Sequence, residues 1–301
     1  MSSINLNSKT CLGFIGLGTL GLPIATNLVN AGFTLKVHTR SRTPEKNKAL
    51  KDAQTCISPK AAAKDCDVLL VCVSDENAVE EVIFGPHGAI NSLKSGATIL
   101  DLSTISPSKA KLFAEKLIQK NIQYIDAPVT GGTEGAKKGT LTIFLGTDND
   151  SLKKLSFILD AIGSCFYAFG NVGKGQEVKA INQIMVAGSY IAVAEAISLG
   201  ETLMLPMDQV IEALEKGAGS SWALSNRSQA MLNDNYPLGF KLQLHHKDLS
   251  IALQVAEDSG IKLPITAQVK KLEEDLIKKG YKDLDVSVLK RSIRKTSSIK
   301  N

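Results

Sequence analysis

The apolar positions of this chain follow two different patterns, one in each half. In the first half, short apolar runs typical of buried strands alternate with stretches in which apolar residues recur every three or four positions, as on one face of a helix. The predicted strands comprise residues 11–18, 34–39, 67–74, 97–104, 122–128, 141–146 and 165–170. This alternation predicts an α/β fold with a doubly wound, parallel sheet.

The second half begins with one long helical pattern, from Gly173 to Pro206. At about 1.5 Å per residue, this helix would be roughly 45 Å long, and we interpret it as a link between two domains. Its apolar positions predict a single buried stripe made of Ile181, Ile184, Met185, Gly188, Ile191, Ala192 and Leu199. Every later pattern is also helical, so we predict an α/β domain over residues 1–172 and an all-α domain over residues 173–301.

Composition narrows the classes of function. The 301 residues are 44% hydrophobic and 22% charged, which is typical of a globular protein, and the net charge of +5 gives no reason to expect a nucleic-acid partner. No apolar run approaches the ~18 residues of a membrane span, and the N-terminus lacks a signal sequence. The five cysteines form no CxxC pair, so we expect a cytoplasmic protein with no membrane partner. His245 and His246 have no third partner at ligand spacing, so we expect no metal site.

Three glycines follow the first predicted strand in the spacing G-x-G-x-x-G and precede a predicted helix. This spacing gives a tight turn, a backbone that can approach a pyrophosphate, and a helix that packs closely on the strand. A turn without a ligand is the alternative, but the strand and the helix on either side favour a dinucleotide. The contacts that we expect come from Gly16, Leu17, Gly18, Thr19 and Leu20.

The end of the second predicted strand bears on the choice of cofactor. Sites that prefer NAD usually place a carboxylate here for the ribose hydroxyl. This chain has Thr39, Arg40 and Ser41 instead, followed by Arg42. A guanidinium attracts the 2′-phosphate that a carboxylate would repel, so we predict NADP, with NAD less favoured. The alternative is that Arg40 and Arg42 are ordinary surface charges.

Polar residues stand at the ends of two further predicted strands, where ligands of such sheets bind. Val73, Ser74 and Thr104 are therefore candidates to contact the cofactor. Ser74 and Thr104 have an equally good alternative, which is to cap the helices that follow them.

A third segment combines a hydroxyl with two consecutive glycines: Thr130, Gly131 and Gly132. Glycine amides can converge on an anion such as a carboxylate, because no side chain blocks the approach. The alternative is a plain turn, the more common use of a glycine pair.

Four segments, taken in order, carry a resemblance to a known family. They read GFIGLGTLGLPIATNLVNAG, DAPVTGGTEGAKKGTLTIFLG, GNVGKGQEVKAINQ and YPLGFKLQLHHKDLSIAL. Together they span nearly the whole chain and resemble the β-hydroxyacid dehydrogenases. The resemblance implies a Rossmann-type domain for the dinucleotide, an all-helical second domain and a long helix between them.

The resemblance also implies roles for single residues. Lys179 falls on the family's catalytic lysine, in the pattern G-x-G-x-x-x-K, whereas its position on a helix would by itself indicate a solvated lysine. As a catalytic group it would give a proton to the carbonyl oxygen during reduction. The further assignments are a substrate-carboxylate segment at Thr130, Gly131 and Gly132, a cofactor contact at Thr104, and Lys247 near the nicotinamide.

Gln183 departs from the family pattern, which usually has Asn four residues after the lysine. This chain has Asn182 and then Gln183. Glutamine keeps the amide but is one methylene longer, and it shares a helix face with Lys179. We expect Gln183 to bind the substrate or to orient the lysine.

We therefore predict an NAD(P)-dependent oxidoreductase that interconverts a small β-hydroxyacid and its semialdehyde. The predicted direction is the reduction of a short aldehyde acid (glyoxylate, succinic semialdehyde or tartronate semialdehyde) with NADPH. The alternatives are a 3-hydroxyisobutyrate dehydrogenase that works oxidatively and a non-catalytic module that senses the dinucleotide. We expect a small carboxylate-bearing aldehyde or hydroxyacid as ligand and a homodimer or homotetramer, since the family is commonly oligomeric.

Overall fold

The structure is a computed structural model that describes residues 10–40 and 48–293. The chain divides into two compact units, Met1–Lys179 and Ala180–Asn301, which are described separately below. Ser41, one of the predicted cofactor contacts, lies outside the described residues.

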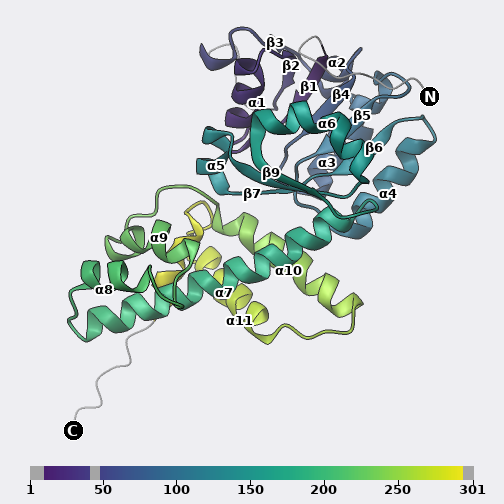
Figure 1. The fold of residues 1–301 in the computed structure, drawn as a ribbon. Helices are drawn as coiled ribbons and strands as arrows, with labels where there is room; N and C mark the ends of the chain where they lie inside the picture. The colour runs from purple at the N-terminus through teal and green to yellow at the C-terminus, as the bar shows by residue number, and fades with distance from the viewer. Residues whose placement is uncertain (1–9, 41–47, 294–301) are drawn as a thin grey trace. The chain divides into compact units, whose positions relative to one another are not determined.

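A six-stranded sheet forms the centre of the first unit (Figure 1). All of its strand pairs are parallel, and the order is β3-β2-β1-β4-β5-β6. The strands are β1 (Cys11–Ile15), β2 (Thr34–His38), β3 (Gln54–Thr55), β4 (Val68–Val71), β5 (Thr98–Asp101) and β6 (Gln123–Asp126). The predicted doubly wound parallel sheet is therefore confirmed.

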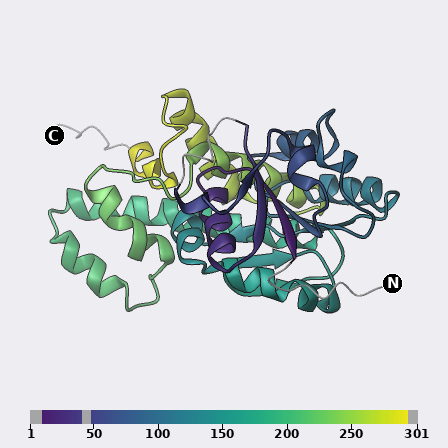
Figure 2. The same cartoon turned by 90° about the horizontal axis from the view of Figure 1, so that it is seen from above.

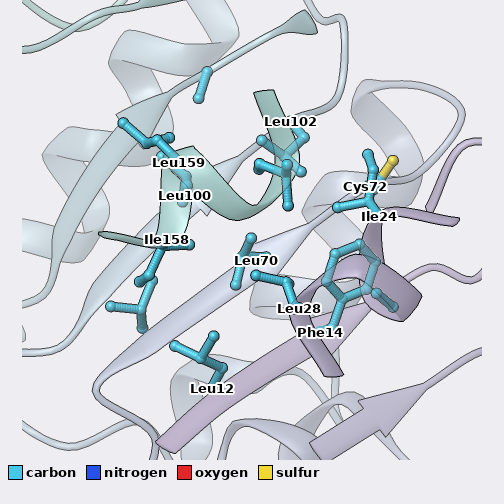
Figure 3. Packing of buried hydrophobic residues seen from close by; sticks show 14 of the residues in the cluster. Leu12, Phe14, Ile24, Leu28, Leu70, Cys72, Leu100, Leu102, Ile158 and Leu159 are labelled. Atoms are coloured by element: carbon cyan, nitrogen blue, oxygen red, sulfur yellow. The ribbon is translucent and has the colours of Figure 1, made fainter. Parts of the chain in front are cut away.

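Helices cover both faces of this sheet. The helices are α1 (Gly21–Asn30), α2 (Pro59–Ala63), α3 (Glu76–Phe84), α4 (Pro107–Ile118) and α6 (Asn149–Ile162), with the short 3-10 turns η2 (Lys48–Leu50) and η3 (Ala89–Asn91). One core cluster joins the strands to α1 and α6, and its side chains are drawn in Figure 3. The other joins the strands to α2, α3 and α4.

Strand β4 shows why the sequence of a covered strand is apolar throughout. Val68 and Leu70 belong to the cluster under α1 and α6. Leu69 and Val71 point the other way, into the cluster under α2, α3 and α4. Because side chains alternate between the two faces of a strand, a strand with helices on both faces needs an apolar residue at every position.

A second, smaller sheet follows in the same unit, in the order β7-β8-β9. It consists of β7 (Val129–Thr130), β8 (Leu141–Leu145) and β9 (Gly163–Ala168), with helix α5 (Gly132–Lys138) between β7 and β8. The β7–β8 pair is antiparallel and the β8–β9 pair is parallel. The sequence predicted strands at β8 and β9, but β7, like β3, α2 and α5, is too short for its period to be read.

Helix α7 (Lys174–Thr202) begins in the first unit and continues into the second. The second unit is helical throughout its described part, as predicted. Its further elements are α8 (Met207–Leu214), α9 (Trp222–Leu232), α10 (Leu242–Asp258), α11 (Pro264–Lys278) and the 3-10 helix η4 (Val286–Ser292). Helices α8 and α9 return along the C-terminal part of α7, as Figures 1 and 2 show, and share an apolar cluster with it.

The prediction of the buried stripe on α7 was wrong. Ile181, Met185 and Leu199 are all more than half exposed. The buried face instead contains Ala187, Ala194 and Ile197, together with polar residues near the start of the helix. The central part of α7 is apolar on nearly every side, so its sequence period does not identify the side that packs.

Helix α7 is also longer and more apolar than expected, because we predicted that no apolar segment approaches the length of a membrane span. One 18-residue window of it has a mean hydropathy of 1.4, and 39% of that window is buried inside the protein. Among residues 10–40 and 48–293 it is the only helix long and apolar enough to cross a membrane by length and composition. The central helix of a folded protein has the same composition, so this is weak evidence for a membrane span.

Candidate active site

The carboxyl ends of β1, β4, β5 and β6 meet at one edge of the parallel sheet. The chain moves outward from β1 to β2 and β3, and then crosses back to place β4 on the other side of β1. This reversal makes the β1/β4 edge the topological switch point, where ligands of open α/β sheets bind. All of the predicted cofactor contacts except Lys247 follow β1, β2, β4 and β5, so the fold gathers the described members of this set along this edge. Lys247 lies on α10, in the second unit.

The glycine turn between β1 and α1 has the geometry that its spacing predicts. Gly16 has a φ of +101°, and a Cβ there would lie 2.2 Å from the Cys72 carbonyl oxygen. A Cβ at Gly21 would lie 1.9 Å from the Gly16 carbonyl oxygen, so α1 packs directly on the turn. At Gly18 a Cβ would meet nothing within 4 Å, and a hollow of about 310 Å³ opens beside Gly18 and Thr19. Two glycines thus permit close packing, while the third leaves its backbone open to a ligand.

Thr39 and Arg40 follow β2, the strand next to the glycine turn. The Gly16 N–H donates to the His38 carbonyl oxygen (2.9 Å), which holds the two strand ends together. Thr39 is half-buried and the Arg40 side chain is exposed. A guanidinium in this place can approach a phosphate on the adenosine ribose of a dinucleotide.

Val73, Ser74 and Thr104 lie beyond β4 and β5, but neither polar residue is the helix cap. Asp75 caps α3 by accepting from the Ala78 N–H, and Ser106 caps α4. This removes the capping alternative for Ser74 and Thr104. The sequence reading missed Ser103, whose hydroxyl accepts from the Val73 N–H at 3.0 Å and so joins the ends of β4 and β5.

Lys179 is buried on α7, contrary to the solvated lysine that its helical position alone would indicate. Its Nζ donates to the Val129 carbonyl oxygen at 2.8 Å. Val129 immediately precedes the segment formed by Thr130, Gly131 and Gly132. The first unit therefore brings the predicted proton donor and the predicted carboxylate segment together.

The carboxylate segment turns sharply at its two glycines. Gly131 has a φ of +123° and Gly132 a φ of +64°, values that residues with a Cβ rarely adopt. Thr130 is half-buried at the end of β7. Gly131 is exposed and Gly132 is half-buried, so an oxyanion could approach the main chain at Gly131.

Two carboxyl groups are buried below this edge, at the ends of β5 and β6. Asp101 accepts from the Tyr124 hydroxyl (2.7 Å) and from the Ser103 N–H (2.9 Å). Burial raises the pKa of Asp101 to about 6, although these hydrogen bonds favour the ionised form. Burial also raises the pKa of Asp126, and there too two backbone amides, Gly173 and Gln176, oppose the shift.

In the second unit, the predicted residues Gln183 and Lys247 meet at Asp248. The Gln183 Nε2 donates to Asp248 Oδ2 at 2.7 Å, and the Lys247 Nζ lies 3.1 Å from Oδ1. The Asn182 side chain donates to Gln183 Oε1 at 2.7 Å. The sequence reading missed Asp248, although it follows Lys247 directly, because no local pattern indicates that its carboxylate reaches a residue on α7.

The described residues contain no group of three or more His, Cys, Asp and Glu side chains that could hold a metal ion. His245 is fully buried, and its Nδ1 lies 2.5 Å from Glu273 Oε1 on α11. Trp222 is half exposed and lies against the Arg227 guanidinium.

Comparison with known proteins gives matches over both halves of the chain. Residues 11–170 match the family model described as the NAD-binding domain of 6-phosphogluconate dehydrogenase. Residues 173–293 match the model described as NAD-binding of NADP-dependent 3-hydroxyisobutyrate dehydrogenase.

Curated relatives match over most of their length. The chain is 36% identical over 282 residues to 2-hydroxy-3-oxopropionate reductase of Escherichia coli, covering 94% of this chain and 96% of that protein. It is 33% identical over 264 residues to 2-(hydroxymethyl)glutarate dehydrogenase of Eubacterium barkeri, covering 87% and 88%. Among solved structures, a 3-hydroxyisobutyrate dehydrogenase from Salmonella typhimurium has a TM-score of 0.85 and 26% identity, covering 95% of this chain and 100% of that one.

Proposed function

The chain belongs to the β-hydroxyacid dehydrogenase family of NAD(P)-dependent oxidoreductases, and from this premise we propose that it reduces a short aldehyde acid with NADPH. The single observation that carries the proposal is the buried Lys179 ammonium, fixed on the Val129 carbonyl at the entrance to the carboxylate segment. The proposed substrates are glyoxylate, succinic semialdehyde and tartronate semialdehyde.

The residues present fit a nicotinamide dinucleotide. The backbone at Gly18 is open, since a Cβ there would meet nothing within 4 Å, and in our proposal it would hold the pyrophosphate. Leu17, Thr19 and Leu20 complete the turn, and Val73, Ser74 and Thr104 lie along the neighbouring strand ends. When bound, the nicotinamide supplies the hydride that the reaction needs.

Lys179 would act on the carbonyl oxygen of the substrate. During reduction this oxygen gains negative charge, which an ammonium group within hydrogen-bond reach stabilises and then protonates. The Val129 carbonyl accepts one of the ammonium hydrogens, which fixes the group beside the segment 130–132. Thr130, Gly131 and Gly132 would hold the carboxylate of the same substrate.

The relatives support a substrate of this class. Tartronate semialdehyde is the substrate named by the E. coli relative, 2-hydroxy-3-oxopropionate reductase, and it is a three-carbon aldehyde acid. Both ends of the Gln183 amide are bonded to protein groups, to Asn182 and to Asp248. In the oxidative direction the same residues would serve a 3-hydroxyisobutyrate dehydrogenase, the activity named in the Salmonella structure.

We propose NADP as the preferred cofactor, supported by the exposed Arg40 guanidinium beside the glycine turn. Ser41, the third residue of this proposed phosphate contact, is outside the described residues. No carboxylate occupies the described positions 39 and 40, where one would favour the ribose hydroxyl of NAD.

We also propose that two copies associate through the outer face of α7 and that the protein works in the cytoplasm. The outer face consists of five exposed residues and the half-buried Gly188 among them; the exposed ones are Ile181, Met185, Ala192, Ala196 and Leu199. Contiguous exposed apolar residues favour association, and a second copy offers the same face. All five cysteines are free thiols, which supports a reducing compartment.

The decisive experiment replaces Lys179 with alanine and measures reduction of the proposed aldehydes, and of methylmalonate semialdehyde, with NADPH and with NADH. We expect kcat to fall by about 10²–10⁴-fold, the usual contribution of a general acid. Lys174→Ala is the control, because Lys174 is an exposed lysine on the same helix. Near-normal turnover by Lys179→Ala would remove the assignment, and no turnover by the unmodified protein on any aldehyde would favour the non-catalytic module.

A further inference from the structure

We propose that Asp126 is a positioning residue that holds Lys179 in place by capping the first turn of α7 from the end of β6. The inference rests on the proposed role of Lys179. It concerns contacts within the first unit only, between β6, the β8 end and residues 173–179.

The Asp126 carboxylate bonds to two backbone amides at the start of α7. Its Oδ1 accepts from the Gly173 N–H at 2.7 Å and its Oδ2 from the Gln176 N–H at 2.9 Å. The first amides of a helix have no partner within the helix, and a negative group there also favours the helix dipole. A cap of this kind normally comes from the residue that precedes the helix, whereas this one lies 47 residues earlier in the chain.

Three glycines allow the carboxylate to come this close. A Cβ at Gly146 would lie 2.0 Å from Asp126 Oδ1. A Cβ at Gly175 would lie 2.3 Å from the Phe144 carbonyl oxygen and 2.9 Å from Asp126 Oδ2. Gly173 has a φ of +95°, which directs its N–H at the carboxylate. The G-x-G part of the pattern before Lys179 is therefore needed for the contact between the Asp126 carboxylate and the start of α7.

Both partners of the Asp126 contact, the helix and the strand segment, lead directly to Lys179. Lys179 follows the capped Gln176 by three residues on the helix, which is nearly one turn. Val129, whose carbonyl accepts from the Lys179 Nζ, follows Asp126 by three residues on the other chain segment. The two contacts therefore fasten one helical turn to one short strand segment, and the carboxylate segment begins at the next residue, Thr130.

A side chain of α7 adds a third contact to the same turn. The Gln176 Nε2 donates to the Ser103 carbonyl oxygen at 2.8 Å, and its Oε1 accepts from the Ile105 N–H at 3.2 Å. These two hydrogen bonds hold α7 to the loop after β5. The position of the same helical turn relative to β6 depends on the Asp126 cap. Loss of the cap would move the lysine relative to the carboxylate segment without unfolding the turn.

The test is Asp126→Asn, which keeps the size of the side chain but presents an NH2 group to one of the two amides. We expect kcat to fall by about 10- to 100-fold, because a displacement of about 1 Å costs that much, while the dissociation constant of NADPH, measured by its fluorescence, stays nearly unchanged. Hydrogen exchange of the peptide 173–183 should become faster. In the Lys179→Ala background, Asp126→Asn should reduce the residual rate little further, because it acts through the lysine.

Asp148→Asn is the matched control. Asp148 also accepts a backbone N–H at a helix start, from Ser151 at 2.7 Å, but it is exposed at the start of α6. We expect unchanged kcat and unchanged exchange at 173–183. If Asp126→Asn does not fold, Gly146→Ala displaces the same carboxylate, because the nearest atoms to a Cβ at Gly146 all belong to the Asp126 side chain, and it should give the same kinetic pattern.

Three outcomes would overturn the inference: wild-type kcat in Asp126→Asn, unchanged exchange at 173–183, or losses that add fully to those of Lys179→Ala. Failure of the proposed function looks different. In that case Lys179→Ala would keep its activity, while the exchange measurement would still report whether Asp126 holds the helix turn.

Discussion

Lys179 is buried and bonded to a main-chain carbonyl, a rare position for a lysine side chain. Moving an ammonium group out of water costs free energy, which one hydrogen bond to a neutral carbonyl offsets only in part. The place of Lys179 beside a glycine-rich turn therefore calls for a reason other than stability. The proposed proton transfer supplies that reason. The proposed roles of Arg40 and Gln183 can also be tested by single substitutions.

Arg40→Glu should reduce the preference for NADPH over NADH. A hydrogen bond between charged groups contributes about 1.5–3 kcal/mol, so we expect the ratio of kcat/KM values for the two cofactors to fall by about 10- to 100-fold or more. The measurement is steady-state kinetics with each cofactor at saturating aldehyde. An unchanged ratio would make Arg40 an ordinary surface charge.

Gln183→Asn should destabilise the protein, even though it restores the residue usual in the family. The shorter side chain would no longer reach Asp248 Oδ2, and a buried carboxylate without its donor costs about 1–3 kcal/mol. Urea unfolding measures the loss. Gln229→Asn is the control, since Gln229 donates to Asp208 at 2.9 Å on the surface, where water replaces the bond. Equal stability of the wild type and Gln183→Asn would contradict the role of the pair.

At the scale of elements, two buried polar contacts each join a pair of neighbouring strands or helices. The apolar pattern of the sequence does not by itself indicate that these elements are neighbours. Tyr124 on β6 bonds to Asp101 on β5, and His245 on α10 bonds to Glu273 on α11. Each places an ionisable group where water cannot reach it, so each makes the stability of its element pair depend on charge.

The Asp101 pair predicts a pH dependence of stability. The folded-state pKa of about 6 lies above the ordinary value of 3.8, so the contribution of Asp101 is fully present below pH 3.8 and is lost as the pH rises through 6. The loss amounts to roughly 3 kcal/mol. Asp101→Asn cannot ionise, so its free energy of unfolding relative to wild type should rise between pH 4 and pH 7, measured in urea. A difference that stays constant between pH 4 and pH 7 would show that Asp101 does not titrate in this range.

The His245–Glu273 pair predicts a large effect on the helical unit. Glu273→Leu removes one partner of a buried pair and leaves the other unsatisfied, which costs about 3–5 kcal/mol. Glu274→Leu is the control, because Glu274 is the next residue on α11 and pairs with Lys278 at the surface. Thermal unfolding should separate the two variants clearly. Similar melting temperatures would mean that the buried pair contributes no more than the exposed one.

At the scale of the whole molecule, the outer face of α7 predicts self-association. Leu199→Glu should place a charge in the proposed interface and shift the mass measured by light scattering from an oligomer to a monomer. Ile118→Glu is the control, since Ile118 is even more exposed but lies on α4. If Leu199→Glu keeps the oligomer, or if the unmodified protein is a monomer, this face is not the interface.

Much of the fold followed from the sequence because the relevant signals are local. The apolar run at 67–74 contains β4, and Gly16, Gly18 and Gly21 identified the turn with the conformation that the structure has. Short elements such as β7 and α5 were missed, because two to seven residues contain less than two helical turns or too few alternations to define a period. The position of β7 follows from its antiparallel pairing with β8, which comes later in the chain.

The candidate site was predicted in its residue types but not in its supports. Lys179, Thr130 and Gln183 were named from the resemblance, whereas Asp126 and Asp248 were not. Both missed residues act on partners far along the chain, 47 and 65 residues away. No local pattern indicates such a pairing, because the residue type alone does not show whether a carboxylate is buried or which distant residue it contacts.

The sequence by itself determined the alternation of strands and helices, the glycine turn and the helical second half, because backbone conformation and period depend on residues that are close along the chain. Only the tertiary structure decided which side of α7 is buried, that Lys179 is held by the Val129 carbonyl, and that Asp126 caps the helix. These depend on which distant surfaces meet, and the free energy of burying a side chain is set by its neighbours in space.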